Sequence, residues 1–344
     1  MKKVLIITHS EDNECINIVS QKLKSYGATA IRFNVDDYPL HCSLSTCFEN
    51  NEWKIYLDKE GERTNLHDIE ALWYRRSHNL AKGLETVLEQ EYLGSTHGEI
   101  RTTLFGMLES LNCFQIGKYS VYRRLDSKEE QLKIAHQLGM NIPDTCITNN
   151  PAEAKRFVLA HPHGVVTKMQ SSFAIYREGI ESVVFTNSIG PDDFEDIGSL
   201  QYCPMQFQEK IEKKVELRVT IVGDEVFTFA IDSQKLENAK IDWRKEGVEL
   251  LQDWKPYPLP EEIKLQLLRL MDVYQINYGA IDIIVTPEDA YYFLEINSAG
   301  EFFWLDRLIE GQISEQLAKV LTGNANRRYI PVYATENTTA LLSE

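Results

Sequence analysis

The sequence has no run of about 18 consecutive apolar residues, although 43% of its 344 residues are hydrophobic. The short apolar run 4–7 is followed by polar residues at 8–12, which is typical of a strand and loop rather than a signal peptide. Its six cysteines form no C-x-x-C pair, which argues against a zinc site or a disulfide framework. These absences predict a globular cytoplasmic protein with reduced cysteines and no membrane span.

Basic residues are scarce as well. The chain has 36 Lys and Arg against 52 Asp and Glu, a net charge of -16, which disfavours nucleic acid as a partner. The acidic excess could attract a basic peptide, but such an excess more often only keeps a protein soluble. The chain contains no G-x-x-x-x-G-K-[ST] loop, and no Ser or Cys nucleophile stands out. Its length predicts two or three compact units.

Along the chain, hydrophobic periodicity predicts alternating strands and helices at the N-terminus. A strand at 4–8 is followed by a helix at 12–26, and a further strand is expected at 71–74. A long helix is expected at 83–111, followed by a connection through 119–126.

The most informative stretch is 278–297, where two apolar runs flank a turn-forming segment and predict a β-hairpin. With the loop at 288–289, the pairing sets Asp282 opposite Glu295. Because side chains alternate along a strand, Asn297 falls on the same face. The residues expected to pack behind this face are Ile281, Ile283, Leu294 and Ile296.

Two carboxylates facing each other on a sheet repel unless a cation lies between them. Mg²⁺ prefers hard oxygen ligands, and water and substrate phosphates commonly complete its shell beside one or two protein carboxylates. Asp282, Glu295 and Asn297 are therefore candidate metal ligands. The alternative is a solvated acidic face on an edge hairpin. The small residues at 298–300 leave room for a nucleotide and favour the metal site.

The hairpin resembles the metal-binding end of the ATP-grasp fold, and further segments resemble the microviridin-type ligases, which macrocyclise ribosomal precursor peptides. The segments that carry this resemblance are 73–76 (WYRR), 166–169 (VTKM), 173–176 (FAIY), 242–247 (DWRKEG) and 301–304 (EFFW). The resemblance, which ends near residue 322, implies an α/β (α+β) ATP-grasp fold. Its expected units are an N-terminal α/β pre-ATP-grasp domain at 1–119, a small central subdomain at 120–205 and a C-terminal subdomain at 206–323. The composition of 324–344 suggests a flexible tail or an appended extra.

The resemblance implies ATP as a cofactor, with phosphate contacts from two lysines. Lys128 lies in the first turn of a helix capped by 126–127, where a cation is unfavourable unless a phosphate is near. An exposed lysine is the alternative there. Lys168 lies in the mostly apolar strand 164–169, where a desolvated ammonium needs an anionic partner.

Residues 204–211 resemble the linker that binds adenine through backbone groups in ATP-grasp proteins. Glu216 matches the acidic residue that takes the ribose hydroxyls. Arg218 lies two residues further on the same strand face, where a guanidinium would stabilise transferring charge. A structural Glu216–Arg218 pair is the alternative. The candidate adenine contacts are Gln208, Glu209, Lys210 and Ile211.

Two further sites involve arginines. Arg75 and Arg76 follow the strand 71–74, and ligands gather at the carboxyl ends of strands in α/β sheets, so these residues are candidates for binding a substrate carboxylate. A surface ion pair is the alternative. The long charged segment 232–247 is a candidate lid. Within it, Arg244 is expected to contact the transferred phosphate, unless it is exposed loop charge.

The resemblance implies an ATP- and Mg²⁺-dependent ligase that activates Asp or Glu side chains of a ribosomal precursor peptide with a leader segment. Attack by Thr or Ser hydroxyls gives ω-esters, and attack by Lys gives ω-amides. Segments 173–176, 242–247 and 301–304 resemble the ester-forming members more closely. A glutamate or amino-acid ligase and a nucleotide-binding regulatory protein remain as alternatives, and a homodimer stays open.

Overall fold

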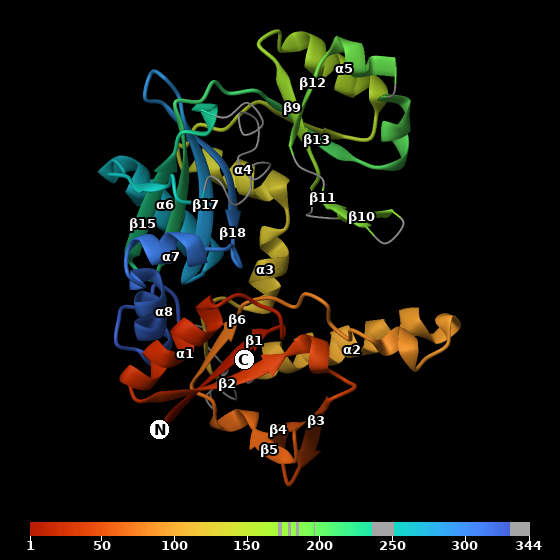
Figure 1. The fold of residues 1–344 in the computed structure, drawn as a ribbon, viewed down its shortest axis with the longest axis vertical. Helices are drawn as coiled ribbons and strands as arrows, with labels where there is room; N and C mark the ends of the chain where they lie inside the picture. Colours follow the sequence, from red (N-terminus) through yellow and green to blue (C-terminus); the bar gives the residue numbers. More distant parts are fainter. Residues whose placement is uncertain (171–173, 178–179, 184–185, 196, 236–250, 331–344) are drawn as a thin grey trace, which may run out of the picture.

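The computed structural model describes residues 1–170, 174–177, 180–183, 186–195, 197–235 and 251–330. Figure 1 shows three units, with the N-terminal unit below, the C-terminal sheet above it on the left, and the central unit at upper right. Among the described residues, no helix combines the length and apolar character that a bilayer crossing requires.

A parallel sheet with strand order β2-β1-β6-β7 forms the centre of the N-terminal unit. Alternate residues of β1 enter two different cores, so this strand is buried on both faces, as expected for a central parallel strand. Helix α1 covers one face and α2 covers the other. The bounds are β1 Lys2–Thr8, α1 Cys15–Ser25, β2 Ala28–Asn34, β6 Ala71–Tyr74, α2 Gln90–Ser110 and β7 Phe114–Gln115.

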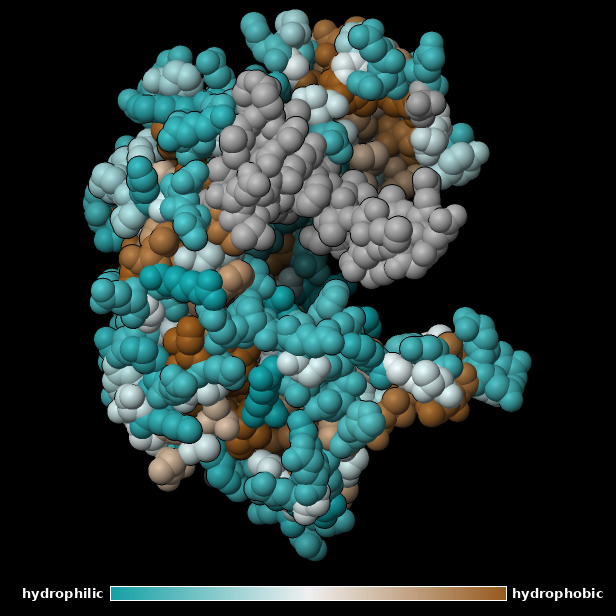
Figure 2. Space-filling model, in the orientation of Figure 1, coloured by the Kyte–Doolittle hydropathy of each residue, from teal (hydrophilic) through white to brown (hydrophobic). Residues whose placement is uncertain are grey.

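The helix predicted for this region begins later than expected, and a second helix was not predicted. The segment expected as one helix from residue 83 contains a short 3-10 turn at Leu84–Thr86, and α2 begins only at Gln90. The connection expected at 119–126 is a helix, α3 Tyr119–Leu125, which buries Tyr122 and Leu125. An antiparallel sheet also lies against the unit, formed by β3 Cys42–Glu49, β4 Glu52–Lys59 and β5 Glu62–Asn65. Figure 2 shows that the visible face of this unit is mostly hydrophilic.

The central unit is a small antiparallel sheet, in the order β12-β9-β13-β8, with its own core around Phe157, Val165 and Phe207. Helix α5 begins after Asn150, whose side chain accepts a hydrogen bond from the backbone N–H of Ala152. The bounds are β8 Thr145–Thr148, α5 Pro151–Ala160, β9 Val165–Lys168, β12 Asn187–Ile189 and β13 Met205–Glu209, with a separate hairpin of β10 Ala174–Arg177 and β11 Ile180–Val183.

The C-terminal unit is a five-stranded antiparallel sheet with strand order β16-β15-β14-β17-β18. Helix α6 packs its buried face against the sheet, and α4, which is capped by the Ser127 side chain, lies along β18. The bounds are α4 Lys128–Gln137, β14 Val215–Val222, β15 Glu225–Ile231, β16 Lys255–Pro256, α6 Glu261–Tyr274, β17 Tyr278–Val285, β18 Tyr291–Asn297, α7 Phe303–Leu308 and α8 Gln312–Thr322.

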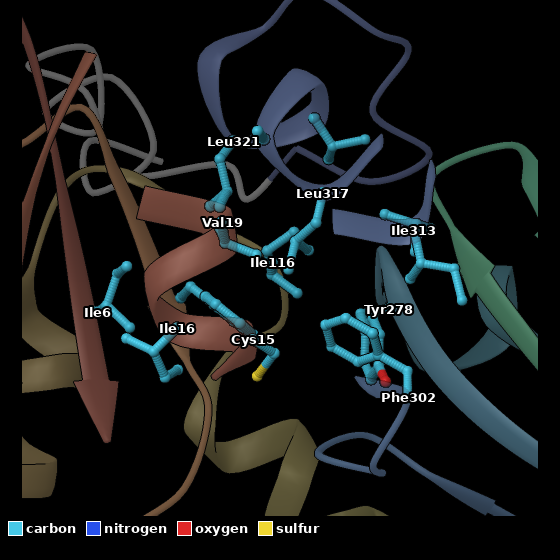
Figure 3. Packing of buried hydrophobic residues seen from close by; sticks show 14 of the residues in the cluster. Ile6, Cys15, Ile16, Val19, Ile116, Tyr278, Phe302, Ile313, Leu317 and Leu321 are labelled. Carbon is cyan, nitrogen blue, oxygen red and sulfur yellow. The ribbon is translucent and has the colours of Figure 1, made fainter. Parts of the chain in front are cut away.

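The N-terminal and C-terminal units share one hydrophobic core. Ile16 and Val19 of α1 belong to the same buried cluster as Leu317 and Leu321 of α8, which Figure 3 shows at close range. The core of the central unit contains none of these residues. The two larger units are therefore packed as one body, and the central unit is attached to it.

The predicted hairpin forms, and its register sets Asp282 opposite Glu295 as expected. Beyond this pair the register shifts by one residue, so that Ile283 faces Phe293 instead of Leu294. Phe293 is therefore 2% exposed in the core, whereas Leu294 lines a cavity. The prediction that Leu294 packs behind the sheet was wrong because an irregularity of this kind changes the face of the residues that follow it.

The packed chain continues beyond residue 323, where composition placed the start of a tail. Arg327 donates to the carbonyls of Val320 and Leu321, at 2.9 and 2.8 Å, and its guanidinium lies 3.7 Å from the centre of the Phe114 ring. Arg328 forms ion pairs with Asp224 and Asp272 at 2.6 and 2.7 Å. Residues 324–330 are thus part of the folded unit, and 331–344 lie outside the described residues.

Candidate active site

A cavity of about 160 Å³ lies between the sheet of the central unit and the sheet of the C-terminal unit. Strands β9 and β13 supply one wall, and β14, β17 and β18 supply the other. The cavity brings together predicted site residues that are far apart in the sequence. Those that line it are Lys168, Gln208, Glu209, Lys210, Ile211, Glu216, Arg218, Asp282, Glu295 and Asn297.

Each of the two facing carboxylates has a cationic partner. Nη1 of Arg218 donates to both carboxylate oxygens of Asp282, at 2.6 and 2.8 Å. Nζ of Lys128 donates to the Glu295 carboxylate, and both side chains are largely withdrawn from solvent. Lys128 therefore reaches the site from the start of α4. The alternative drawn from the sequence, an exposed lysine, does not describe it. These two ion pairs offset the repulsion between Asp282 and Glu295.

The donor set fits a magnesium ion. Asp282, Glu295 and Asn297 line the cavity and offer two carboxylates and an amide oxygen, which are all hard ligands. Within the described part of the chain, no cluster of three or more His, Cys, Asp or Glu side chains is placed to hold a metal. A site built here would thus take two carboxylates from the protein and leave positions for phosphate and water, which is the usual arrangement for Mg²⁺.

Glu216 is held by neighbours other than Arg218. It accepts hydrogen bonds from Nζ of Lys213 at 3.0 Å and from Oγ of Ser233 at 2.6 Å. Arg218 turns instead to Asp282, the residue opposite it in the β14–β17 register. These contacts therefore do not form the structural Glu216–Arg218 pair that the sequence left open as an alternative.

An aromatic ring lies beside the guanidinium of Arg218. Its central carbon lies 5.7 Å from the centre of the Trp304 ring, and the Trp304 ring lies 6.3 Å from that of Trp254. Trp254 also lines the cavity. A cation over an aromatic face is held electrostatically as well as by packing. Sequence reasoning singled out Trp304 only as part of 301–304 and missed Trp254 and Lys213, which lie in no recognisable motif.

Arg75 and Arg76 form a different cluster, at the carboxyl end of β6. Arg75 is 1% exposed and donates to the carbonyl of Ala299 and to the carboxylate of Glu301, each at 2.5 Å. Arg76 also donates to Glu301 and lies 3.6 Å from Asp12. For Arg75 the structure shows the ion-pair alternative rather than an open carboxylate site, although Arg75 itself is buried and only Glu301 is partly exposed.

The same cluster controls the ionisation of Asp12. Burial alone would raise the pKa of this carboxyl, but Arg75, a hydrogen bond from Thr8 and Arg76 together hold the pKa below its usual value. Asp12 is therefore ionised at neutral pH and balances the arginines. Arg244 and the greater part of the candidate lid lie outside the described residues.

Comparison with known proteins identifies the family. The family model of the MvdD pre-ATP grasp domain matches residues 3–123. A solved structure of a RiPP-associated ATP-grasp ligase from Chryseobacterium gregarium, in complex with ADP and a leader and core peptide, is 53% identical, with a TM-score of 0.93; the match covers 97% of this chain and 100% of that one. RiPPs are ribosomally synthesised and post-translationally modified peptides. This chain belongs to the RiPP-associated ATP-grasp ligases.

The microviridin branch of this family is represented among the similar structures. The macrocyclase MdnC from Microcystis aeruginosa, solved with the precursor peptide MdnA, is 38% identical over 94% of this chain and 100% of that chain, with a TM-score of 0.85. The alpha-aminoadipate–LysW ligase of Sulfurisphaera tokodaii is 21% identical over 253 residues, which is 72% of this chain and 84% of that protein. The ATP-grasp family and fold predicted from the sequence are confirmed.

Proposed function

We propose that this chain is an ADP-forming peptide macrocyclase that uses ATP and Mg²⁺ to join Asp or Glu side chains of a ribosomal precursor peptide to Thr or Ser hydroxyls. The observation that carries the proposal is the cavity between two sheets, where Asp282 and Glu295 face each other. Each of these carboxylates is paired with a cationic side chain, Arg218 or Lys128. The likeness to ligases solved with ADP and with precursor peptides supports the substrate class.

The two ion pairs allow an exchange of partners when nucleotide binds. Asp282, Glu295 and Asn297 would hold Mg²⁺, which neutralises phosphate charge and orients the phosphates for transfer. Arg218 and Lys128 would turn from their carboxylates to phosphate oxygens, joined by Lys168 from the opposite wall. Each carboxylate would then exchange a side-chain cation for Mg²⁺, and each released side chain would pair with a phosphate oxygen. Gln208 to Ile211 would meet the adenine, and Glu216 the ribose.

Two chemical steps then follow. A substrate carboxylate oxygen attacks the γ-phosphorus of ATP, the bond to the β-phosphate oxygen breaks, and ADP leaves. The hydroxyl oxygen of Thr or Ser next attacks the acyl carbon, phosphate leaves, and the hydroxyl proton passes to solvent. Positioning and charge neutralisation supply most of the catalysis in the first step, which fits a described cavity lining that is rich in charge and includes neither Ser nor Cys. Arg218 would stabilise the charge that develops during transfer.

We propose ω-ester rather than ω-amide bonds because segments 173–176, 242–247 and 301–304 resemble the ester-forming ligases more closely. The partner would be a precursor peptide whose leader segment docks separately from its core. Docking of a leader raises the effective concentration of the core at the cavity. Arg244 would contact the transferred phosphate from the candidate lid.

The test is ADP release with ATP and Mg²⁺, using the leader and core peptide of the Chryseobacterium gregarium relative as the first substrate and free glutamate and other amino acids as the second. Peptide-dependent release is the expected result. Release with free amino acids alone would support an amino-acid ligase instead. No substrate-dependent release, from a folded protein that binds ADP, would favour a nucleotide-binding regulatory protein.

A further inference from the structure

A buried arginine of the N-terminal unit reaches the loop that follows the candidate metal ligands. Arg75 lies just after β6, and its Nη1 and Nη2 atoms reach Ala299 and Glu301 at 2.5 Å each, 224 and 226 residues further along the chain. Ala299 comes only two residues after Asn297, the last of the three candidate ligands. One side chain of the N-terminal unit thus contacts the loop of the C-terminal unit that lies directly beside the cavity.

The rest of this loop has little freedom to adjust. The hydroxyl of Tyr278 donates to the carbonyl of Gly300 at 2.6 Å, and Figure 3 shows the Tyr278 ring packed beside Phe302. A Cβ at Gly300 would lie 2.4 Å from the Cβ of Ala280, the residue paired with Asn297. The backbone of the loop is therefore pressed against β17, and Arg75 contacts the same loop at Ala299 and Glu301.

The carboxylate of Glu301 gathers three donors from the N-terminal unit. Besides Arg75 and Arg76, Nδ2 of Asn13 donates to it at 2.8 Å. Asn13 belongs to the turn between β1 and α1, so the carboxylate is held by two separate segments of that unit. A carboxylate held in this way fixes the end of the loop as well as its middle.

We propose that Arg75 is a positioning residue for the metal site: by holding Ala299 and Glu301, it sets where Asn297 and Glu295 lie relative to the cations of the cavity. This inference rests on the magnesium site of the proposed function. Residues that orient metal ligands without touching the metal commonly control metal affinity. The N-terminal unit thereby contributes to metal binding, although the three candidate ligands all belong to the C-terminal unit.

A matched control is available at the same interface. Arg307 of α7 donates to Glu14, beside α1, at 2.5 Å, and both side chains are well exposed. This ion pair also joins the N-terminal and C-terminal units but does not touch the loop 298–301. Glu14→Gln should therefore report any general effect of loosening the interface, and Arg75→Gln the specific effect on the loop.

The experiment measures binding of Mn²⁺, as a spectroscopic substitute for Mg²⁺, to the full chain with ADP by electron paramagnetic resonance. Arg75→Gln should raise the Mn²⁺ dissociation constant by about tenfold or more, whereas Glu14→Gln should leave it unchanged. Arg75→Lys, which keeps the charge but not the forked geometry, should lie between wild type and Arg75→Gln. The KM of the peptide substrate should stay close to the wild-type value in all three variants.

Unchanged Mn²⁺ affinity in folded Arg75→Gln protein would overturn the proposal, and so would a raised peptide KM with normal Mn²⁺ affinity, which would make Arg75 a substrate ligand. If Arg75→Gln does not fold, Arg75→Lys and Glu301→Gln decide in the same assay, because each weakens the contact without leaving a cavity. Wild-type protein that binds ADP but no Mn²⁺ would instead refute the metal site itself.

Discussion

At the scale of single residues, the account depends most on Asp282 and Glu295. We predict that Asp282→Asn and Glu295→Gln each lower kcat for peptide-dependent ADP release by about a hundredfold or more, because each removes a negative charge that would hold the metal ion, and that ion neutralises the phosphates. Both variants should still unfold cooperatively on heating. The amide oxygens can accept the hydrogen bonds from Arg218 and Lys128, and the apolar face of the hairpin is unchanged.

The control for these variants lies on the same hairpin. Asp289 occupies its loop, is paired with Lys214 at 2.6 Å, and is well exposed. Asp289→Asn should keep wild-type turnover, since exposed ion pairs contribute little. ADP release at the wild-type rate by either cavity variant would remove that carboxylate from the metal site.

The two candidate phosphate lysines differ in their surroundings, which gives a second prediction. Lys128 lies in the first turn of α4 and donates to the Glu295 carboxylate, and Lys168 ends the mostly apolar strand β9 and lines the cavity. An ammonium in an apolar strand should gain more from a phosphate than one at the end of a helix. Lys168→Ala should therefore weaken binding of a non-hydrolysable ATP analogue by about tenfold or more, and Lys128→Ala by less. Calorimetric titration of both variants decides, and an equal or reversed order would contradict the assignment.

The facing carboxylates of the candidate site could be predicted from the residues alone, because alternation along strands determines which side chains share a face. This reasoning aligned Asp282 with Glu295 correctly. It could not reveal that Arg75 is buried against Ala299, because that contact joins residues 224 apart through the packing of two units. An arginine at the end of a strand looks the same in the sequence whether it meets a substrate or a neighbouring loop.

At the scale of elements, the register shift in the β17–β18 hairpin has the largest consequence for the site. It sends Phe293 into the core and leaves Leu294 at the cavity. We predict that Phe293→Ala lowers the free energy of unfolding by about 3–5 kcal/mol, because it empties a fully buried position. Leu294→Ala should cost far less stability and instead change nucleotide affinity.

Urea unfolding and nucleotide titration of this neighbouring pair test the register directly. A larger loss of stability for Leu294→Ala than for Phe293→Ala would mean that the strand pairs without the shift. The shift was not predictable from the sequence, because residues 291–297 could equally well form a regular strand that pairs with β17 without any irregularity. Helix α3 was missed for a related reason. A segment of seven residues is too short to establish a period.

At the scale of the whole molecule, the hydrophobic cores divide the protein into a large body, formed by the N-terminal and C-terminal units, and the smaller central unit. The N-terminal and C-terminal units share buried residues of α1 and α8, and the central unit keeps a separate core. The cavity lies between the large body and the central unit, so movement of the central unit changes the distance between its two walls. Closure between such units around bound substrate is a common way to exclude water from a reaction.

The choice between a peptide hydroxyl and water as the nucleophile also depends on the whole molecule. In the proposed reaction, the acyl phosphate must react with a hydroxyl, a poor nucleophile at neutral pH, in preference to water. A peptide held by its leader can present its core repeatedly to the closed cavity, whereas a free amino acid cannot. The account therefore expects a macromolecular substrate rather than a small one.

The most direct measurement is mass spectrometry of the leader and core peptide of the Chryseobacterium gregarium relative after incubation with this protein, ATP and Mg²⁺. The account predicts a loss of one water for each ring, rings that open in mild base, and much slower reaction of the core without its leader. Base-stable rings would contradict the ester assignment, and equally fast reaction without the leader would contradict separate recognition. A peptide of unchanged mass, with wild-type protein that binds ADP, would contradict the macrocyclase function itself.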